Sequence, residues 1–209
     1  MPTNDTLIFQ HVHSNSDCLQ WVALTTPITL EYCRIHKMDY RLIVGDLGEL
    51  SPKGEWGHWI VTQLIKEFFD LGYDNIIYLD ADTIISDSSV DLRDACKPDF
   101  IGAVWHNLKY NNPDWSHYNV GALYISTTAK VRNFVNLWLD GYPGTRSFPW
   151  LDQGVFGKIG AEMGIINHLD NRWNAGHVSP SENPVVLGLH GFPDRYEAMY
   201  KEVEKLRAK

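Results

Sequence analysis

Residues 76–79 (Ile-Ile-Tyr-Leu) form an apolar run that ends directly in two carboxylates, Asp80 and Asp82. A short apolar run rich in β-branched residues predicts a strand that is buried on both faces, as in a parallel sheet. Because side chains alternate along a strand, the two aspartates are expected to point the same way where the strand ends. Open α/β sheets bind their ligands at the carboxyl ends of their strands. This segment therefore predicts an α/β protein with an acidic site at one edge of its sheet.

The two aspartates allow a functional and a structural interpretation. Carboxylate oxygens suit Mg2+ or Mn2+, and such a metal usually accompanies a phosphate, which predicts a metal-dependent enzyme with a phosphorylated substrate. In the alternative, Asp80 caps the next element and Asp82 is a solvated turn residue. These two residues alone do not decide between the interpretations.

The flanking sequence predicts alternating strands and helices in the first half of the chain, which favours a parallel or mixed sheet with right-handed crossovers. The elements expected there are strands at 6–12, 40–44 and 75–79 and helices at 19–37, with a kink at Pro27, and at 58–71. The second half is less regular. It is expected to hold strands at 100–104, 120–126 and 185–189, a loop at 107–117, and helices at 129–139, 150–159 and 196–208.

Length and composition restrict the class of protein. With 209 residues, 44% of them apolar, the chain is expected to form one globular domain over residues 1–209. A net charge of −8, from 26 acidic and 18 basic residues, argues against broad nucleic-acid binding. An acidic protein that binds a diphosphate must neutralise it locally, and a divalent cation on Asp80 and Asp82 would do so.

Targeting signals and cysteine usage predict a cytoplasmic protein. No run approaches the roughly 20 apolar residues of a membrane span, and the polar N-terminal sequence lacks the features of a signal peptide. The three cysteines, Cys18, Cys33 and Cys96, are odd in number and widely spaced. This pattern predicts free thiols rather than a disulfide framework or a zinc site.

Four later motifs complete a constellation with the acidic pair. They are Tyr-Asn-Val-Gly-Ala at 118–122, Trp-Leu-Asp-Gln-Gly at 150–154, Arg-Trp-Asn-Ala-Gly at 172–176 and Leu-Gly-Leu-His-Gly-Phe at 187–192. In this order the motifs resemble the GT-A class of nucleotide-sugar glycosyltransferases. The closest pattern is that of the retaining families that include glycogenin-like, lipopolysaccharide galactosyltransferase-like, and xylosyl- or mannosyl/galactosyltransferase-like enzymes. The resemblance covers about residues 7–195 and implies one GT-A domain, in which helices flank a central, mixed, mostly parallel sheet.

The resemblance also implies roles for individual residues. The segment Asp80, Ala81 and Asp82 would hold Mn2+ or Mg2+ on the donor diphosphate, with His190 as the third protein ligand. The segment His11, Val12 and His13 would receive uracil and ribose. Asn119 would contact the donor sugar, and Asp152 and Gln153 would lie beneath the reacting sugar as catalytic residues.

This sequence departs from the family pattern after the late histidine. Gly191 follows His190 immediately, and Phe-Pro-Asp-Arg-Tyr replaces the usual Lys-Pro-Trp. Arg195 is expected to supply the positive charge that the missing lysine gives the diphosphate.

The sequence therefore predicts a metal-dependent hexosyltransferase. Its donor is expected to be a UDP-sugar, UDP-glucose as the first guess, and its acceptor a glycan or another hydroxyl, with retention of configuration. The alternatives are a non-catalytic sugar-binding module, a nucleotidyltransferase, or an Asp-x-Asp phosphatase, which would have Thr or Val in place of Ile84.

Structural roles stay open for several site candidates. Asn119 could cap a turn, Asp152 could cap a helix, and His190 could be a packed histidine. The aromatic residues Trp105, Trp115 and Tyr118 are interpreted either as core or as a stacking platform for the acceptor sugar.

Overall fold

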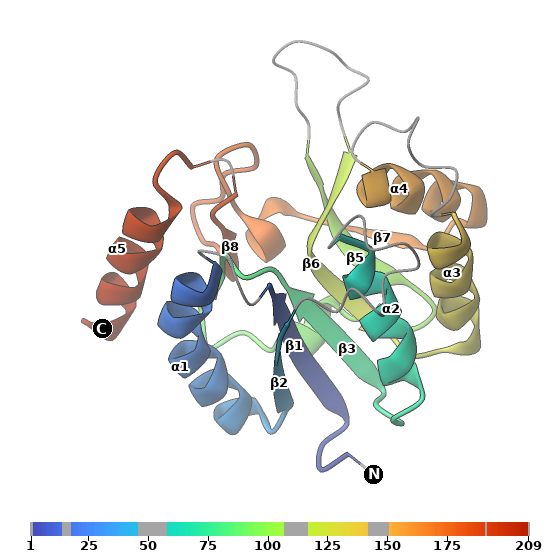
Figure 1. The fold of residues 1–209 in the computed structure, drawn as a ribbon, viewed down its shortest axis with the longest axis horizontal. Coiled ribbons are helices and arrows are strands. Elements are labelled where there is room, and N and C mark those ends of the chain that lie inside the picture. The colour runs from blue at the N-terminus through green and yellow to red at the C-terminus, as the bar shows by residue number, and fades with distance from the viewer. Residues whose placement is uncertain are drawn as a thin grey trace.

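The computed structural model describes residues 2–13, 18–45, 58–106, 117–141, 151–190 and 192–208 (Figure 1). The strands are β1 Thr6–Val12, β2 Asp39–Val44, β3 Asn75–Leu79, β4 Thr83–Ile85, β5 Ile101–His106, β6 His117–Ser126, β7 Ile166–Leu169 and β8 Val186–Gly188. The helices are α1 Cys18–His36, α2 His58–Phe69, α3 Ala129–Asp140, α4 Leu151–Met163 and α5 Arg195–Arg207, with short 3-10 helices η1 Leu92–Ala95 and η4 Asn171–Asn174.

A six-stranded mixed sheet of order β2-β1-β3-β6-β5-β7 forms the centre of the fold. The pairs β1–β2, β1–β3 and β5–β7 are parallel, whereas β6 runs antiparallel to both β3 and β5. Strands β4 and β8 form a separate antiparallel ribbon. The predicted mixed, mostly parallel sheet flanked by helices is therefore confirmed.

Helices cover both faces of the sheet because its central strands are apolar on both sides. On one face, side chains of α2, α3 and α4 pack against Leu7, Ile76 and Leu123. On the other face, α1, η1 and η4 pack against Ile8 and Ile77. Ile76 and Ile77 are adjacent in β3 and both are 0% exposed, as the prediction of a strand buried on both faces requires.

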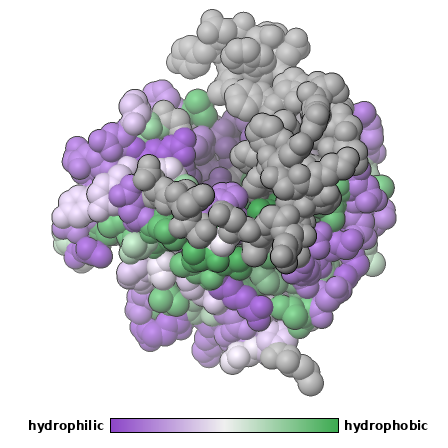
Figure 2. Space-filling model, in the orientation of Figure 1, coloured by the Kyte–Doolittle hydropathy of each residue, from purple (hydrophilic) through white to green (hydrophobic). Residues whose placement is uncertain are grey.

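Helix α5 packs on α1 and on the β4–β8 ribbon through Met199 and Val203, which are fully buried. Its outer side carries ion pairs within the helix, among them Lys201 with Glu197 at 3.1 Å. The α5 side of the molecule is mainly hydrophilic in Figure 2. The predicted charged C-terminal helix thus has one solvated face, and its other face packs against α1 and the ribbon.

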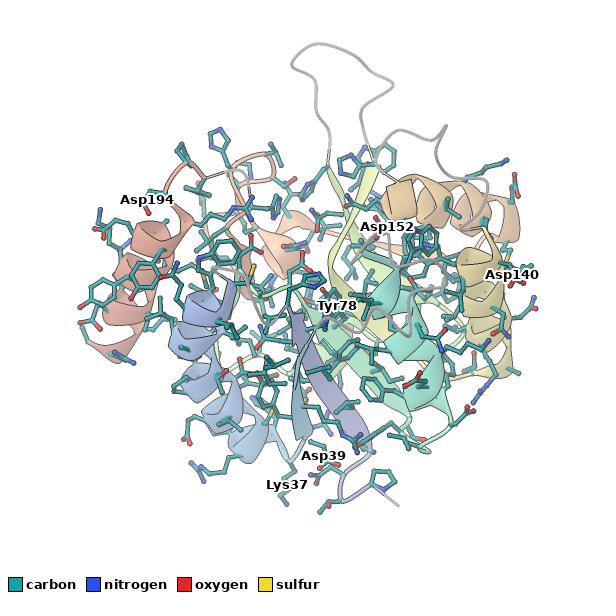
Figure 3. All side chains as sticks on the ribbon, in the orientation of Figure 1. Lys37, Asp39, Tyr78, Asp140, Asp152 and Asp194 are labelled. Atoms are coloured by element: carbon teal, nitrogen blue, oxygen red, sulfur yellow. The ribbon has the colours of Figure 1, made fainter. Side chains whose placement is uncertain are left out.

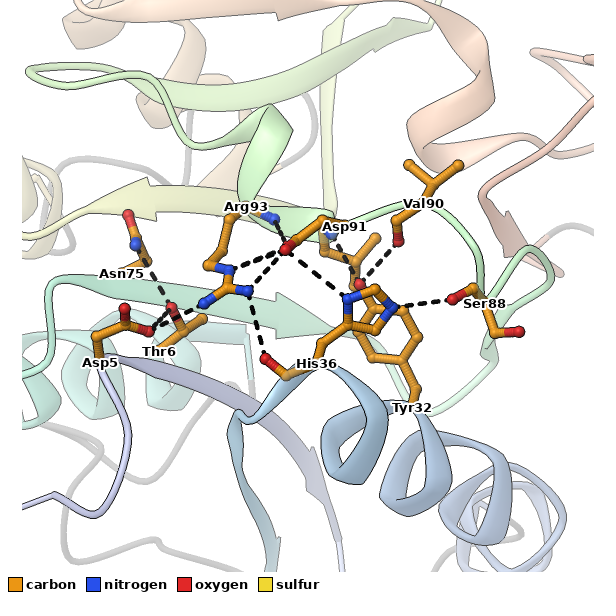
Figure 4. A network of polar contacts seen from close by, with 10 residues as sticks. Asp5, Thr6, Tyr32, His36, Asn75, Ser88, Val90, Asp91 and Arg93 are labelled. Atoms are coloured by element: carbon orange, nitrogen blue, oxygen red, sulfur yellow. Dashed lines mark hydrogen bonds and ion pairs between the residues drawn. The ribbon is translucent and has the colours of Figure 1, made fainter.

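A polar network holds η1 against α1 near the amino end of β1 (Figure 4). Arg93 pairs with Asp91 at 2.7 Å and with Asp5, just before β1, at 3.4 Å. The hydroxyl of Tyr32 accepts a hydrogen bond from the amide of Leu92 at 2.7 Å. These contacts stabilise the end of the sheet opposite to the carboxyl ends of β1 and β3.

Most predicted elements are present, with ends that differ by a few residues. The prediction missed β4, β7 and both 3-10 helices. It also placed His117 in a loop, whereas this residue begins β6; residues 107–116 lie outside the described part of the chain. The three cysteines are free, as predicted. Within the described residues, no helix combines the length and apolar character that a membrane span requires.

Candidate functional site

Two cavities meet where β3 ends. The first, here the β1 cavity, has a volume of about 330 Å³ and is lined by His11, Val12, His13, Cys18, Trp21, Val61, Tyr78, Asp80, Ala81, Asp82 and Arg195. The second, here the β6 cavity, has a volume of about 370 Å³ and is lined by Val61, Tyr78, Asp80, His106, His117, Asn119, Val120, Gly121, Trp138, Asp152, Gln153, Val178 and His190. Every residue predicted for the site lines one of these cavities, and Asp80 lines both.

The two aspartates of the acidic pair lie on either side of a turn that follows β3. The chain turns directly after β3, where the amide of Thr83 donates to the carbonyl of Asp80 at 3.1 Å. As a result Asp82 lines only the β1 cavity, whereas Asp80 lines both cavities. Both carboxylates nevertheless line the β1 cavity, although Asp82 follows the turn and is no longer part of that strand.

Asp82 is a buried carboxylate that pairs with Arg195. Its side chain is 6% exposed, and its Oδ2 accepts a hydrogen bond from Arg195 Nη1 at 3.1 Å. Burial, together with the nearby charge of Asp80, raises the pKa of Asp82 to about 7, and Arg195 opposes this shift only in part. A further positive charge beside Asp80 and Asp82 would therefore be stabilised.

Tyr78 lies between the carboxylates of the site. It is 4% exposed, its hydroxyl donates to Asp80 Oδ1, and it lines both cavities. Burial, then the charges of Asp80, Asp82 and Asp152, raises the pKa of Tyr78 well above its ordinary value, so the hydroxyl remains a donor at neutral pH. Figure 3 shows Tyr78 and Asp152 towards the centre of the molecule, whereas Asp194 lies at its periphery.

An irregularity in β6 directs Asn119 to the β6 cavity. The β5–β6 register shifts between Gly102, the partner of Tyr124, and Val104, the partner of Asn119. Such bulges re-aim side chains and are common beside active sites. A methyl group on Gly121, within this irregular stretch, would lie 2.6 Å from Asp80 Oδ2, so only glycine leaves room for that oxygen.

Hydrogen bonds fix the orientation of the Asn119 amide. Its Oδ1 accepts from the amide of Gly121 at 2.7 Å and from Nδ2 of Asn174 at 2.8 Å. Since the oxygen is engaged twice, the amide nitrogen of Asn119 is the group that remains for a ligand. Asn174 is 0% exposed and belongs to the Arg-Trp-Asn-Ala-Gly motif, whose role in the site is to hold Asn119.

Asp152 and Gln153 lie in the first turn of α4, beside the first half of β6. The indole nitrogen of Trp138 donates to the carbonyl of Asp152 at 2.9 Å, and the amide of Val120 donates to Gln153 Oε1 at 3.2 Å. Asp152 is the second residue of α4 and 5% exposed. These contacts attach the start of α4 to α3 and to β6, so that both side chains border the β6 cavity.

His190 belongs to a histidine group that the sequence interpretation did not identify. Its ring stacks on that of His106 with centroids 5.0 Å apart, and His117 lies 6.0 Å from His106. Burial lowers the pKa of His106 to about 3 and also lowers the pKa of His190, which the charge of Asp80 opposes. His106 is the last residue of β5, and His117 is the first residue of β6. Their positions at adjoining ends of two consecutive strands were the signal available in the sequence.

The chemistry of this donor set fits a divalent cation, although the side chains are not gathered around one point. Two carboxylates and a neutral imidazole suit Mn2+, and the Nε2 atom of His190 is buried without a hydrogen-bond partner among the described residues. No group of three His, Cys, Asp or Glu residues in the described ranges lies close enough to hold a metal. Asp80 lies between the other two candidates, since it shares one cavity with Asp82 and the other with His190.

The first strand contributes a polar edge to the β1 cavity. His11 is 7% exposed, and its Nε2 donates to the carbonyl of Gly45 at 3.1 Å. The His13 ring packs against it with centroids 5.1 Å apart. Trp21, which the sequence interpretation did not select, lines the same cavity from α1, and the Arg195 guanidinium lies 5.3 Å from the centre of its ring.

Of the aromatic residues considered for an acceptor platform, Trp105 and Tyr118 line neither cavity. Trp105 and Tyr118 pack edge to face with ring centroids 4.9 Å apart, and Tyr118 also contacts Phe156 of α4. Tyr118 thus packs against the core on the α4 side of the sheet. Trp115 lies outside the described residues.

Comparisons with solved structures identify the fold. A glycosyltransferase involved in the glycosylation of the major capsid of PBCV-1 is similar over 98% of this chain and 99% of its own, with a TM-score of 0.67 and 14% identity. The galactosyltransferase LgtC, solved in complex with donor and acceptor sugar analogues, is similar over 95% of both chains, with a TM-score of 0.57 and 13% identity. An active-site mutant of LgtC gives a TM-score of 0.60 at 12% identity. The chain has the GT-A fold of these glycosyltransferases. No protein-family model matches the sequence, and no curated protein matches it in sequence.

Proposed function

We propose that this protein is a glycosyltransferase that moves a hexose from a UDP-sugar to a glycan or another hydroxyl acceptor. The observation that carries the proposal is the position of Asp80 at the junction of the two cavities. The β1 cavity would receive the nucleotide and the β6 cavity the sugar, so that the diphosphate between them lies beside Asp80. The GT-A fold supports this division, and one neighbour of that fold binds donor and acceptor sugar analogues.

The residues around the junction suit a diphosphate and a divalent cation. Asp80 and Asp82 would hold Mn2+ or Mg2+, with His190 as a further ligand. When bound, the metal would neutralise charge on the departing UDP. Arg195, at the edge of the β1 cavity, would donate to a phosphate oxygen once its pairing with Asp82 is released. Trp21 and the His11–His13 segment would contact the nucleoside.

The β6 cavity provides the groups for sugar transfer. The amide nitrogen of Asn119 would donate to a hydroxyl of the donor sugar. Gln153, whose oxygen accepts from Val120, keeps its amide nitrogen for the same sugar. Positive charge develops at the anomeric carbon as its bond to UDP breaks, and the carboxylate of Asp152 would stabilise that charge. With Asp152 in this role, the acceptor hydroxyl would attack from the side that UDP leaves and give its proton to a phosphate oxygen of the departing UDP, so that configuration is retained.

A thermal-shift panel of nucleotide sugars, with Mn2+ and with a chelator, tests the proposal. A ligand that binds only the folded state raises the unfolding temperature by mass action. We expect UDP-sugars, UDP-glucose first, to stabilise the protein with Mn2+ and to do so much less with the chelator. Stabilisation by free glycans with no effect of nucleotides would instead indicate a sugar-binding module and would reject the transferase.

Asp80→Ala and Asp82→Ala test the same proposal by activity. Each variant should lose metal-dependent transfer and weaken donor binding, because each removes a carboxylate from the diphosphate site. Metal-dependent hydrolysis of UDP-sugar at nearly the wild-type rate in both variants would reject the assignment.

A further inference from the structure

Tyr78 occupies a position from which it controls a single oxygen of Asp80. It is buried in β3 two residues before Asp80, and its hydroxyl donates to Asp80 Oδ1. Residues two apart on a strand lie on the same side, so this contact needs no distortion of the chain. One of the two carboxylate oxygens is therefore engaged inside the protein.

The main chain of Asp80 is held by groups from other elements. Its amide donates to the carbonyl of Gly121 at 2.7 Å. Its carbonyl accepts from Thr83 Oγ1 at 2.7 Å and from Gln10 Nε2 at 3.0 Å. Gln10 is 0% exposed, and Tyr40 fixes its amide by donating to Oε1 at 2.8 Å. The backbone on which the Asp80 carboxylate turns is thus attached to β1, β6 and the following turn.

Asp80 Oδ2 is the polar atom of this residue that no described residue engages. It lies against Gly121 at the β6 cavity, where a methyl group on that glycine would approach it to 2.6 Å. With Oδ1 held by Tyr78 and the backbone held on both sides, the carboxylate has one orientation.

We propose that Tyr78 is a positioning residue, which commits Asp80 to offering Oδ2, and only Oδ2, to the bound cation. This inference rests on the proposed function, since the cation is the one that accompanies the donor diphosphate. Hydrogen bonds to a ligating carboxylate orient it, and the loss of such a partner typically weakens metal binding about 10–100-fold.

Mn2+ binding, measured by calorimetry or by electron paramagnetic resonance without any sugar, tests this role. In Tyr78→Phe the carboxylate is free to rotate, and we expect Mn2+ affinity to fall about tenfold. The matched control is Tyr124→Phe. Tyr124 is also fully buried and donates to a main-chain carbonyl, that of Trp173, at 2.6 Å. This control loses a similar hydrogen bond but should keep the Mn2+ affinity of the wild type.

Asp80→Asn gives a second test in which Tyr78 is unchanged. The hydroxyl would hold the carbonyl oxygen of the asparagine, so its amide nitrogen, which cannot bind a metal, would replace Oδ2. We expect Mn2+ binding to be lost. In the double variant Tyr78→Phe with Asp80→Asn the carbonyl is free to turn outward, and binding should recover several-fold over Asp80→Asn alone.

The outcomes separate this inference from the proposed function. If the wild type shows no metal-dependent binding of UDP, the proposed function fails. If the wild type binds Mn2+ but Asp80→Asn binds it nearly as well, the carbonyl is not held inward and the role of Tyr78 is wrong. Equal Mn2+ affinity of Tyr78→Phe and the wild type would overturn that role as well. Equal unfolding temperatures of Tyr78→Phe and Tyr124→Phe would show that a difference in their Mn2+ affinities does not come from a loss of folding.

Discussion

Removal of Arg195 should have opposite effects on the binding of metal and of nucleotide. Its Nη1 lies 3.1 Å from the Oδ2 of Asp82, whose side chain is only 6% exposed. A hydrogen bond between charged groups contributes about 1.5–3 kcal/mol, and since Arg195 is 37% exposed, the lower end of that range applies. A cation that binds Asp82 must displace this pairing. Measured at a pH well above the pKa of Asp82, which is about 7 and which Arg195 lowers, Arg195→Ala should therefore tighten Mn2+ binding without nucleotide by about tenfold.

With Mn2+ saturating, the same variant should bind UDP about tenfold more weakly, because the diphosphate loses a positively charged donor. Titration calorimetry of Mn2+ alone, and of UDP at saturating Mn2+, measures the two affinities. Arg132→Ala is the control, since Arg132 pairs with Asp70 at 2.6 Å on the exposed surface and lines neither cavity. If both affinities fall in Arg195→Ala, or neither changes, the exchange of Arg195 between Asp82 and the diphosphate is refuted.

Three further predictions concern the pH dependence, the cysteines and the glycine of the site. With a chelator present, the free energy of unfolding of the wild type should fall by about 2–4 kcal/mol between pH 4 and pH 8, relative to that of Asp82→Asn. The reason is that the pKa of Asp82 is about 7 in the folded state and about 3.9 in the unfolded state. A carboxyl group whose pKa is raised in the folded state stabilises the fold at low pH and ceases to do so above that raised pKa. A difference in the free energy of unfolding between the wild type and Asp82→Asn that stays constant from pH 4 to pH 8 would contradict this. Cys18 lines the β1 cavity, while burial raises the pKa of each other thiol to about 12, so a thiol reagent should modify Cys18 first. UDP with Mn2+ should slow that reaction, and an unchanged rate in mass spectrometry would count against a nucleotide in this cavity. Gly121→Ala should weaken metal-dependent UDP binding more than tenfold by crowding Asp80 Oδ2, and calorimetry that shows wild-type affinity would disprove the crowding.

The sheet was largely predictable because its central strands are continuous apolar runs between clear turn signals. The prediction of β1 and β3 was correct to the residue. Burial on both faces gives β3 a continuous apolar run, and β1 has such a run at Leu7–Phe9, before Gln10 and His11. The short strands β4 and β7 were missed for a different reason. Three or four residues carry too little periodicity to separate a strand from a turn, and β7 contains a polar pair at Asn167 and His168.

Motifs and family resemblance selected residues that line the two cavities, whereas the contacts of these residues could not be predicted. Asp82 and Arg195 are 113 residues apart, and the packing of α5 on α1 and on the β4–β8 ribbon brings them together. Gln10 is a polar residue in an apolar strand, and its function became clear only once Tyr40 and the Asp80 carbonyl were located. Interactions of this kind depend on tertiary structure, which local sequence patterns do not encode.

A crystal structure with UDP and Mn2+, with data collected at the manganese absorption edge, tests the central claim most directly. The account predicts an anomalous peak beside Asp80 Oδ2, with the diphosphate at the junction of the two cavities and the uracil in the β1 cavity. A nucleotide bound elsewhere, or a manganese peak distant from both Asp80 and Asp82, would contradict it.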